Sequence, residues 1–158
     1  MTGAAVRALG LALGLLVSLA HAQSPAMVAV GTSHPSAVAH YRVQGDGIEQ
    51  ALNGLRGDAL SGQRIVHDRQ VGLCGLCHTF GTSTLTALGG DLAGVGSRLS
   101  AAQLRLRMVD SQVLNPRSIM PAFHRLPTGM RVAAAYAAQP ILQAQQVEDV
   151  VAYLQTLK

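Results

Sequence analysis

The segment with the most distinctive chemistry in this 158-residue chain is Cys74-Gly75-Leu76-Cys77-His78, which contains both cysteines of the sequence. Two thiols at this spacing can add to the two vinyl groups of a haem, and an adjacent imidazole can reach the iron. The spacing therefore predicts that Cys74 and Cys77 attach one haem c covalently and that His78 is an axial ligand of the iron.

Other chemistries also use closely spaced cysteines, but the sequence favours them less. A thioredoxin-like redox pair belongs in a βαβ setting, which this sequence does not indicate. A zinc site would need a second pair of ligands, and there are no further cysteines. A disulfide that closes so short a loop would contribute little stability. Haem attachment is therefore the favoured interpretation.

The second axial ligand must come from a later segment, in which Met108, Met120, His124 and Met130 are the candidates. Met108 falls on the apolar side of a predicted helix, and His124 is expected to be an exposed loop histidine. We predict Met120, because prolines stiffen its loop and apolar neighbours can shield the iron. A thioether favours Fe(II), so ligation by one histidine and one methionine raises the reduction potential relative to ligation by two histidines. It also fills both axial positions, which suits electron transfer.

Arginines are concentrated between the haem motif and the C-terminal helix. Arg98 is a candidate partner for the anionic haem propionates. The others form either a solvated surface or a basic face that meets an acidic partner. The full set is Arg98, Arg105, Arg107, Arg117, Arg125 and Arg131.

Three helices are predicted to position these residues. Asp58 is a good N-cap for a helix over 58–68, and Gly62 within it suggests close approach by another helix. Ser100 is expected to cap a helix over 101–110. A helix over 144–157 carries an apolar stripe at helical spacing, but its N-cap, Gln143, is a poor one, so its first turn is expected to fray. We expect the first and last helices to cross, with Gly62 near Tyr153.

The N-terminus predicts export. Arg7 precedes an apolar run from Leu9 to Ala20 that is too short to span a membrane comfortably, and Ala20-His21-Ala22 offers a cleavage site. We therefore expect residues 1–22 to be a cleaved signal peptide, the alternative being an uncleaved anchor. Residues 23–56 lack a helical period and are interpreted as an irregular N-terminal arm, with a possible short strand over Ala26 to Val30. Residues 57–158 are predicted to form the haem domain.

The mature chain would retain all 8 acidic residues and lose one of 12 basic residues, which gives a net charge of about +3. This charge is too small to indicate nucleic-acid binding. No further apolar stretch is long enough for a transmembrane helix, so no membrane span is expected in the mature chain.

Several segments resemble the SoxX family of sulfur-oxidation cytochromes c, over roughly Val43 to Lys158. The haem motif is generic, whereas the Ile-Met-Pro-Ala-Phe-His run and the C-terminal segment are more specific. The resemblance implies an all-α, class I cytochrome c fold with an irregular N-terminal arm. The matching segments are Gly57–Gly62, Gly72–His78, Asp91–Gly96, Asn115–Arg125 and Pro140–Leu154.

The resemblance also implies a function, that of a monohaem subunit in a periplasmic complex with a SoxA-type cytochrome. Such a complex, an L-cysteine S-thiosulfotransferase, oxidatively couples thiosulfate to a cysteine of the SoxYZ carrier protein. The sulfur chemistry would occur on the SoxA-type subunit, and this chain would pass electrons to a downstream cytochrome. On this interpretation Cys74 and Cys77 are thioether-linked, and His78 and Met120 are the iron ligands. The alternative is a free-standing periplasmic electron shuttle.

One position departs from the family pattern. Many class I cytochromes place a proline before the Asp-Leu-Ala-Gly-Val-Gly turn, and the carbonyl of that proline orients the proximal imidazole. Here the corresponding residue is Gly90. A carbonyl is retained but is held less rigidly, which leaves open whether Gly90 orients His78.

Overall fold

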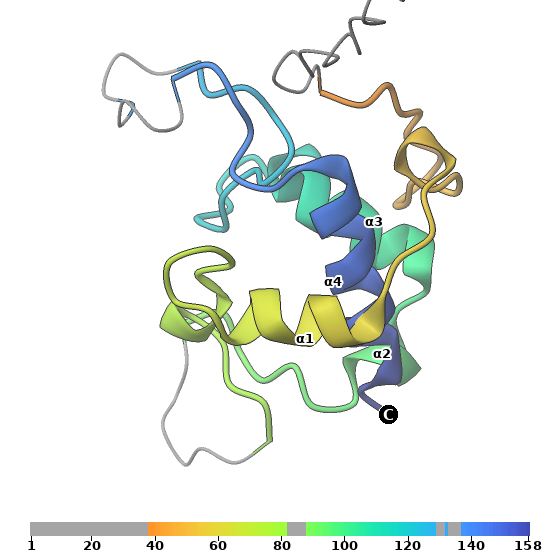
Figure 1. The fold of residues 1–158 in the computed structure, drawn as a ribbon, viewed down its shortest axis with the longest axis vertical. Coiled ribbons are helices and arrows are strands. Elements are labelled where there is room, and N and C mark those ends of the chain that lie inside the picture. The colour runs from red at the N-terminus through yellow and green to blue at the C-terminus, as the bar shows by residue number, and fades with distance from the viewer. Residues whose placement is uncertain (1–37, 82–87, 129–131, 133–136) are drawn as a thin grey trace, which may run out of the picture. The chain divides into compact units, whose positions relative to one another are not determined.

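The computed structural model describes residues 38–81, 88–128, 132 and 137–158. Within these residues the fold is all-helical, with isolated β-bridges and no β-strand, as the sequence predicted (Figure 1). The predicted signal peptide, the strand over Ala26 to Val30, and the residues Met130 and Arg131 lie outside the described residues. The helices are α1 (Ala59–His67), α2 (Val95–Arg98), α3 (Ala101–Asp110) and α4 (Ala144–Thr156), with the 3-10 turns η1 (Leu52–Gly54), η2 (Cys74–Leu76) and η3 (Ser111–Val113).

Helices α1 and α3 begin at the caps expected from the sequence. The Asp58 carboxylate accepts hydrogen bonds from the N–H groups of Leu60 and Ser61, and its pKa is lowered mainly by the Ser61 hydroxyl. At the start of α3, the Ser100 hydroxyl accepts from Gln103 N–H, and the Gln103 side chain accepts in return from Ser100 N–H. Each cap satisfies backbone donors that have no partner inside the helix.

The most extensive helix contact is between α1 and α4, which cross (Figure 1). Gly62 lies at the crossing, where a Cβ would clash with the carbonyl oxygen of Asp149 and would come within 2.9 Å of the Tyr153 Cβ. Only glycine therefore permits this approach, and the predicted contact between Gly62 and the Tyr153 region is confirmed. Asp149 fixes the register, since its carboxylate accepts a 2.8 Å hydrogen bond from Asp58 N–H.

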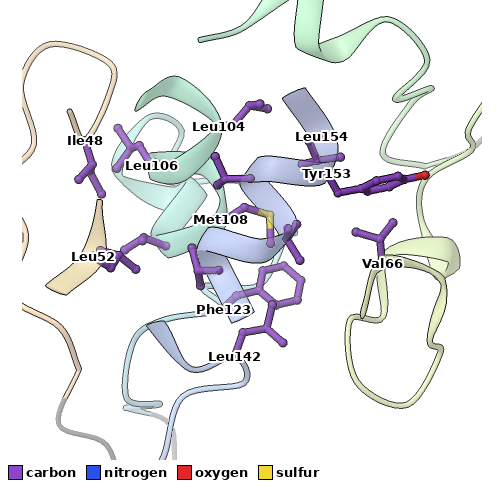
Figure 2. Packing of buried hydrophobic residues seen from close by; sticks show 14 of the residues in the cluster. Ile48, Leu52, Val66, Leu104, Leu106, Met108, Phe123, Leu142, Tyr153 and Leu154 are labelled. Carbon is purple, nitrogen blue, oxygen red and sulfur yellow. The ribbon is translucent and has the colours of Figure 1, made fainter. Parts of the chain in front are cut away.

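Helices α3 and α4 supply much of the hydrophobic core. The Met108 side chain lies within this core beside Phe123, as Figure 2 shows. Val66 reaches the same cluster from α1, and Ile48 and Leu52 reach it from the segment before α1.

The N-terminal turn of α4 is held by a capping box between Gln143 and Gln146. The Gln146 side-chain oxygen accepts a 2.9 Å hydrogen bond from Gln143 N–H, and the Gln143 carbonyl accepts from Val147 N–H. The expectation of a frayed first turn did not take the Gln146 side chain into account.

Residues 38–56 are irregular, yet they are tied to α3 and α4 by a buried polar network. Arg105 forms a bidentate ion pair with Glu148, at 2.7 and 2.9 Å, and donates to the Ile48 carbonyl at 2.6 Å. Glu148 also accepts from Leu52 N–H at 2.8 Å. Each charge is therefore hydrogen-bonded as well as paired, which a buried ion pair requires. Among the described residues, no helix is both long enough and apolar enough to cross a membrane.

Candidate haem site

A cavity of about 600 Å³ lies between the helices, within the range of roughly 300–1,000 Å³ that is common for cofactor and small-molecule sites. Its lining includes all five residues that the sequence selected for a haem site. Apolar side chains from α1, α3 and α4 line part of the remainder, so a bound group would have an apolar surface on that side. The selected residues in the lining are Cys74, Cys77, His78, Arg98 and Met120.

The haem motif adopts a tight turn. It follows Leu73, which lies in the left-handed region with a φ of 60°, and the N–H groups of Cys77 and His78 both donate to the Cys74 carbonyl. This turn brings both cysteines and the histidine into the cavity lining. Burial raises the pKa of the Cys74 thiol to about 11, so this thiol is protonated at neutral pH in the haem-free chain.

The His78 imidazole is oriented by Gly90, since His78 Nδ1 lies 3.1 Å from the Gly90 carbonyl oxygen. A carbonyl can only accept, so Nδ1 carries the proton and Nε2 is left free to bind a metal. The bond that the sequence left open is therefore present. Gly90 forms it with a φ of 78°, a conformation that proline cannot adopt.

Gly89 is a site residue that the sequence reasoning missed. A Cβ at this position would lie 2.6 Å from Cε1 and 2.7 Å from Nε2 of His78, so the glycine backbone packs directly against the imidazole. Its N–H also donates to the Cys77 carbonyl. The Gly-Gly pair before the Asp91 turn is the signal in the sequence that marks this position.

Met120 lines the cavity from the loop that follows η3. Its backbone N–H donates to the Ser118 hydroxyl at 3.2 Å, and its carbonyl accepts from the Ser111 hydroxyl at 3.0 Å. Its neighbour Ile119 is 72% exposed, whereas Phe123 is 3% exposed, so Phe123 is the better shield of the two.

Of the other ligand candidates, Met108 is a buried core residue, as predicted, although it also touches the cavity. The expectation that His124 is an exposed loop histidine is wrong, because it is 1% exposed. Its Nδ1 lies 2.8 Å from the Leu142 carbonyl, and its Nε2 accepts from Ala39 N–H at 3.0 Å. With both ring nitrogens engaged and no place in the cavity lining, His124 is a structural residue here.

Two of the arginines are paired with carboxylates. Arg105 is buried against Glu148, and Arg125 pairs with Asp110 at 2.6 Å. Arg98 lines the cavity and donates to the carbonyls of Ala93 and Asp91. A role for Arg98 in binding propionates stays a prediction, since its guanidinium is already held by these two contacts.

The lining of the cavity fits a c-type haem. One short turn offers two thiols and an imidazole whose Nε2 is free, and a separate loop offers the Met120 thioether. Sulfur and imidazole nitrogen are the donor types with which proteins hold haem iron in electron-transfer sites.

The fold and this cavity define an all-α protein of the class I cytochrome c type. A scan of protein-family models and a search of curated proteins found no match for the sequence. The structure is similar to a chain of SoxXA from P. pantotrophus, with a TM-score of 0.67 and 31% sequence identity. The similarity covers 75% of this chain and 94% of that chain. At this identity and coverage, the chain belongs to the same family as that SoxXA chain.

Proposed function

We propose that this chain is the SoxX-type, electron-accepting monohaem subunit of a SoxAX-like complex that couples thiosulfate to a carrier-protein cysteine. The observation that carries the proposal is the cavity whose lining contains Cys74, Cys77, His78 and Met120. The membership in the family of a SoxXA chain supports it.

When bound, the haem would supply a one-electron Fe(III)/Fe(II) couple. Cys74 and Cys77 would hold it covalently, and His78 would bind the iron through Nε2 while Gly90 keeps the proton on Nδ1. Met120 would occupy the other axial position. With His78 and Met120 both bound to the iron, the site would be suited to electron transfer and not to binding substrate at iron.

The division of labour between subunits follows from the cysteines. Both are assigned to haem attachment, so the sequence has no further cysteine for sulfur chemistry. We therefore assign that chemistry to a SoxA-type partner acting on a SoxYZ carrier, with electrons leaving this chain toward a downstream cytochrome. Export to the periplasm, with cleavage after Ala22, belongs to the same proposal.

Haem attachment is tested first on the exported protein. Its intact mass should exceed the mass of the chain beginning at Gln23 by that of one haem, and the added mass should survive denaturation. Cys74→Ala and Cys77→Ala should each leave one thioether and shift the pyridine haemochrome spectrum. A denatured chain free of haem would contradict the assignment.

The role in a complex is tested by thiosulfate-dependent reduction of the haem, measured with and without a SoxA-type subunit and the SoxYZ carrier. We expect reduction only when both are present, together with co-purification of the SoxA-type subunit from the native host. A monomeric protein that copurifies with no second cytochrome, and whose haem other donors reduce equally well, would instead support a free electron shuttle.

The ligand assignment has its own test. Met120→Ala should abolish the weak methionine-to-iron absorption of the oxidised protein and lower its reduction potential, because the soft thioether favours Fe(II). Met108→Leu is the matched control, since Met108 also touches the cavity but belongs to the core. An unchanged spectrum in Met120→Ala would rule out this ligand.

A further inference from the structure

Both polar groups of the Met120 backbone, its N–H and its carbonyl, are hydrogen-bonded to serine hydroxyls. Ser118 Oγ accepts from Met120 N–H at 3.2 Å, and Ser111 Oγ lies 3.0 Å from the Met120 carbonyl oxygen. The two hydroxyls are also 2.9 Å from each other. The two serines and the backbone of Met120 therefore form one closed ring of hydrogen bonds.

The direction of each bond in this ring follows from counting protons. The Met120 carbonyl can only accept, so Ser111 must donate its one hydroxyl proton to that carbonyl. The bond between the serines must then be donated by Ser118, which leaves Ser118 Oγ free to accept from Met120 N–H. Each hydroxyl donates once and accepts once, an arrangement in which neighbouring hydrogen bonds polarise and strengthen one another.

The ring is anchored to the part of the fold that builds the cavity. Ser111 is 7% exposed and follows α3 directly, and α3 supplies Leu104, Arg107 and Met108 to the cavity lining. Ser118 is half-buried and is held further by its own N–H, which donates to the Asn115 carbonyl at 2.8 Å. The position of the Met120 backbone is thus fixed relative to α3, although the loop that carries Met120 lacks regular secondary structure.

We propose that Ser111 and Ser118 are positioning residues that hold the Met120 thioether in place as the axial ligand. The inference rests on the proposed function, in which Met120 binds the iron. Neither serine contacts the iron in this scheme; they act by limiting the excursions of the Met120 backbone, so that an outside ligand competes poorly for the iron.

The test is an imidazole titration of the oxidised holoprotein, in which free imidazole displaces the methionine. Ser111→Ala and Ser118→Ala should each bind imidazole about tenfold more tightly than the parent, the equivalent of about 1.4 kcal/mol and within the range for one hydrogen bond. Both should also weaken the methionine-to-iron band. Ser118→Thr keeps the hydroxyl and should restore both properties.

Ser100→Ala is the matched control. It removes the cap of α3 and lowers the unfolding midpoint, but it touches no part of the ring, so its imidazole affinity should equal that of the parent. If the Ser111 and Ser118 variants behave like Ser100→Ala, the positioning role is wrong while the ligand assignment stands. If Met120→Ala itself leaves the band and the imidazole affinity unchanged, the ligand assignment has failed, and this inference fails with it.

Discussion

The neighbouring residues Gly89 and Gly90 are glycines for different physical reasons. Gly89 is required for steric reasons, since a Cβ at this position would overlap the His78 ring. Gly90 is favoured for its backbone conformation. A Cβ at this position would meet nothing within 4 Å, but the φ of 78° lies in the left-handed region, which residues with a Cβ rarely adopt. The position that many class I cytochromes fill with proline thus reaches the same imidazole through a backbone shape that excludes proline. Gly90 therefore offers an acceptor to His78 from a backbone conformation different from that of proline.

Gly90→Ala should raise the reduction potential. The carbonyl that accepts from Nδ1 makes the imidazole a stronger donor and stabilises Fe(III), so distorting it favours Fe(II). Loss of about 1 kcal/mol of that interaction corresponds to a rise of about 40 mV for one electron, measured by redox titration of the holoprotein.

Gly45→Ala provides the control for the backbone strain. Gly45 has a φ of 59° and equally open surroundings, but it lies outside the cavity lining. It should lose similar stability with no change in potential. Equal potentials for the two variants would show that the Gly90 carbonyl does not tune the site.

At the scale of elements, the sequence predicted those features of the helices that depend on residues close together in the chain. Asp58 and Ser100 are capping residues within a few positions of the groups they satisfy, and the apolar stripe of α4 is periodic. Prediction from the sequence failed for the burial of His124 and Arg105, because their partners lie far along the chain. Ala39 is 85 residues from His124, and Glu148 is 43 residues from Arg105. A partial signal existed for Arg105, because it and Glu148 are opposite charges set among the apolar positions of two helices.

Gly62→Ala tests the helix crossing. Alanine is the better helix former by about 1 kcal/mol, but the added Cβ meets the backbone of α4, which cannot move aside as a side chain can. We expect a net loss of about 1–3 kcal/mol in the free energy of unfolding of the holoprotein, measured with denaturant. Gln63→Ala, at an exposed position of the same helix, should be neutral or slightly stabilising. Equal stability of the two variants would mean that the crossing tolerates a wider separation.

At the scale of the whole molecule, residues 38–56 share the core of the predicted haem domain. Ile48 and Leu52 are each 1% exposed, and the pair of Arg105 with Glu148 binds the backbone of both. This segment, which has one 3-10 turn but no α-helix or β-strand, is thereby held through contacts with residues far along the chain, which local sequence patterns cannot reveal.

Glu148→Ala should therefore destabilise the holoprotein by about 3–5 kcal/mol, because it leaves a buried guanidinium and the Leu52 N–H without their acceptor. Thermal or denaturant unfolding measures this loss. Glu49→Ala removes an exposed carboxylate from the same region and should change stability by less than about 0.5 kcal/mol. A Glu148→Ala variant as stable as Glu49→Ala would show that the network contributes nothing net.

The crossing of α1 and α4 also bears on the order of events in folding. Asp58 and Asp149, which bond across it, are 91 residues apart, and the Cys-x-x-Cys-His turn lies between them in the sequence. Closing a loop of this length costs chain entropy, and that cost grows only slowly with the number of residues in the loop. In a chain that is exported N-terminus first, as proposed, Cys74 and Cys77 cross the membrane before the α4 segment, so both thiols are accessible for covalent modification while α1 still lacks its partner.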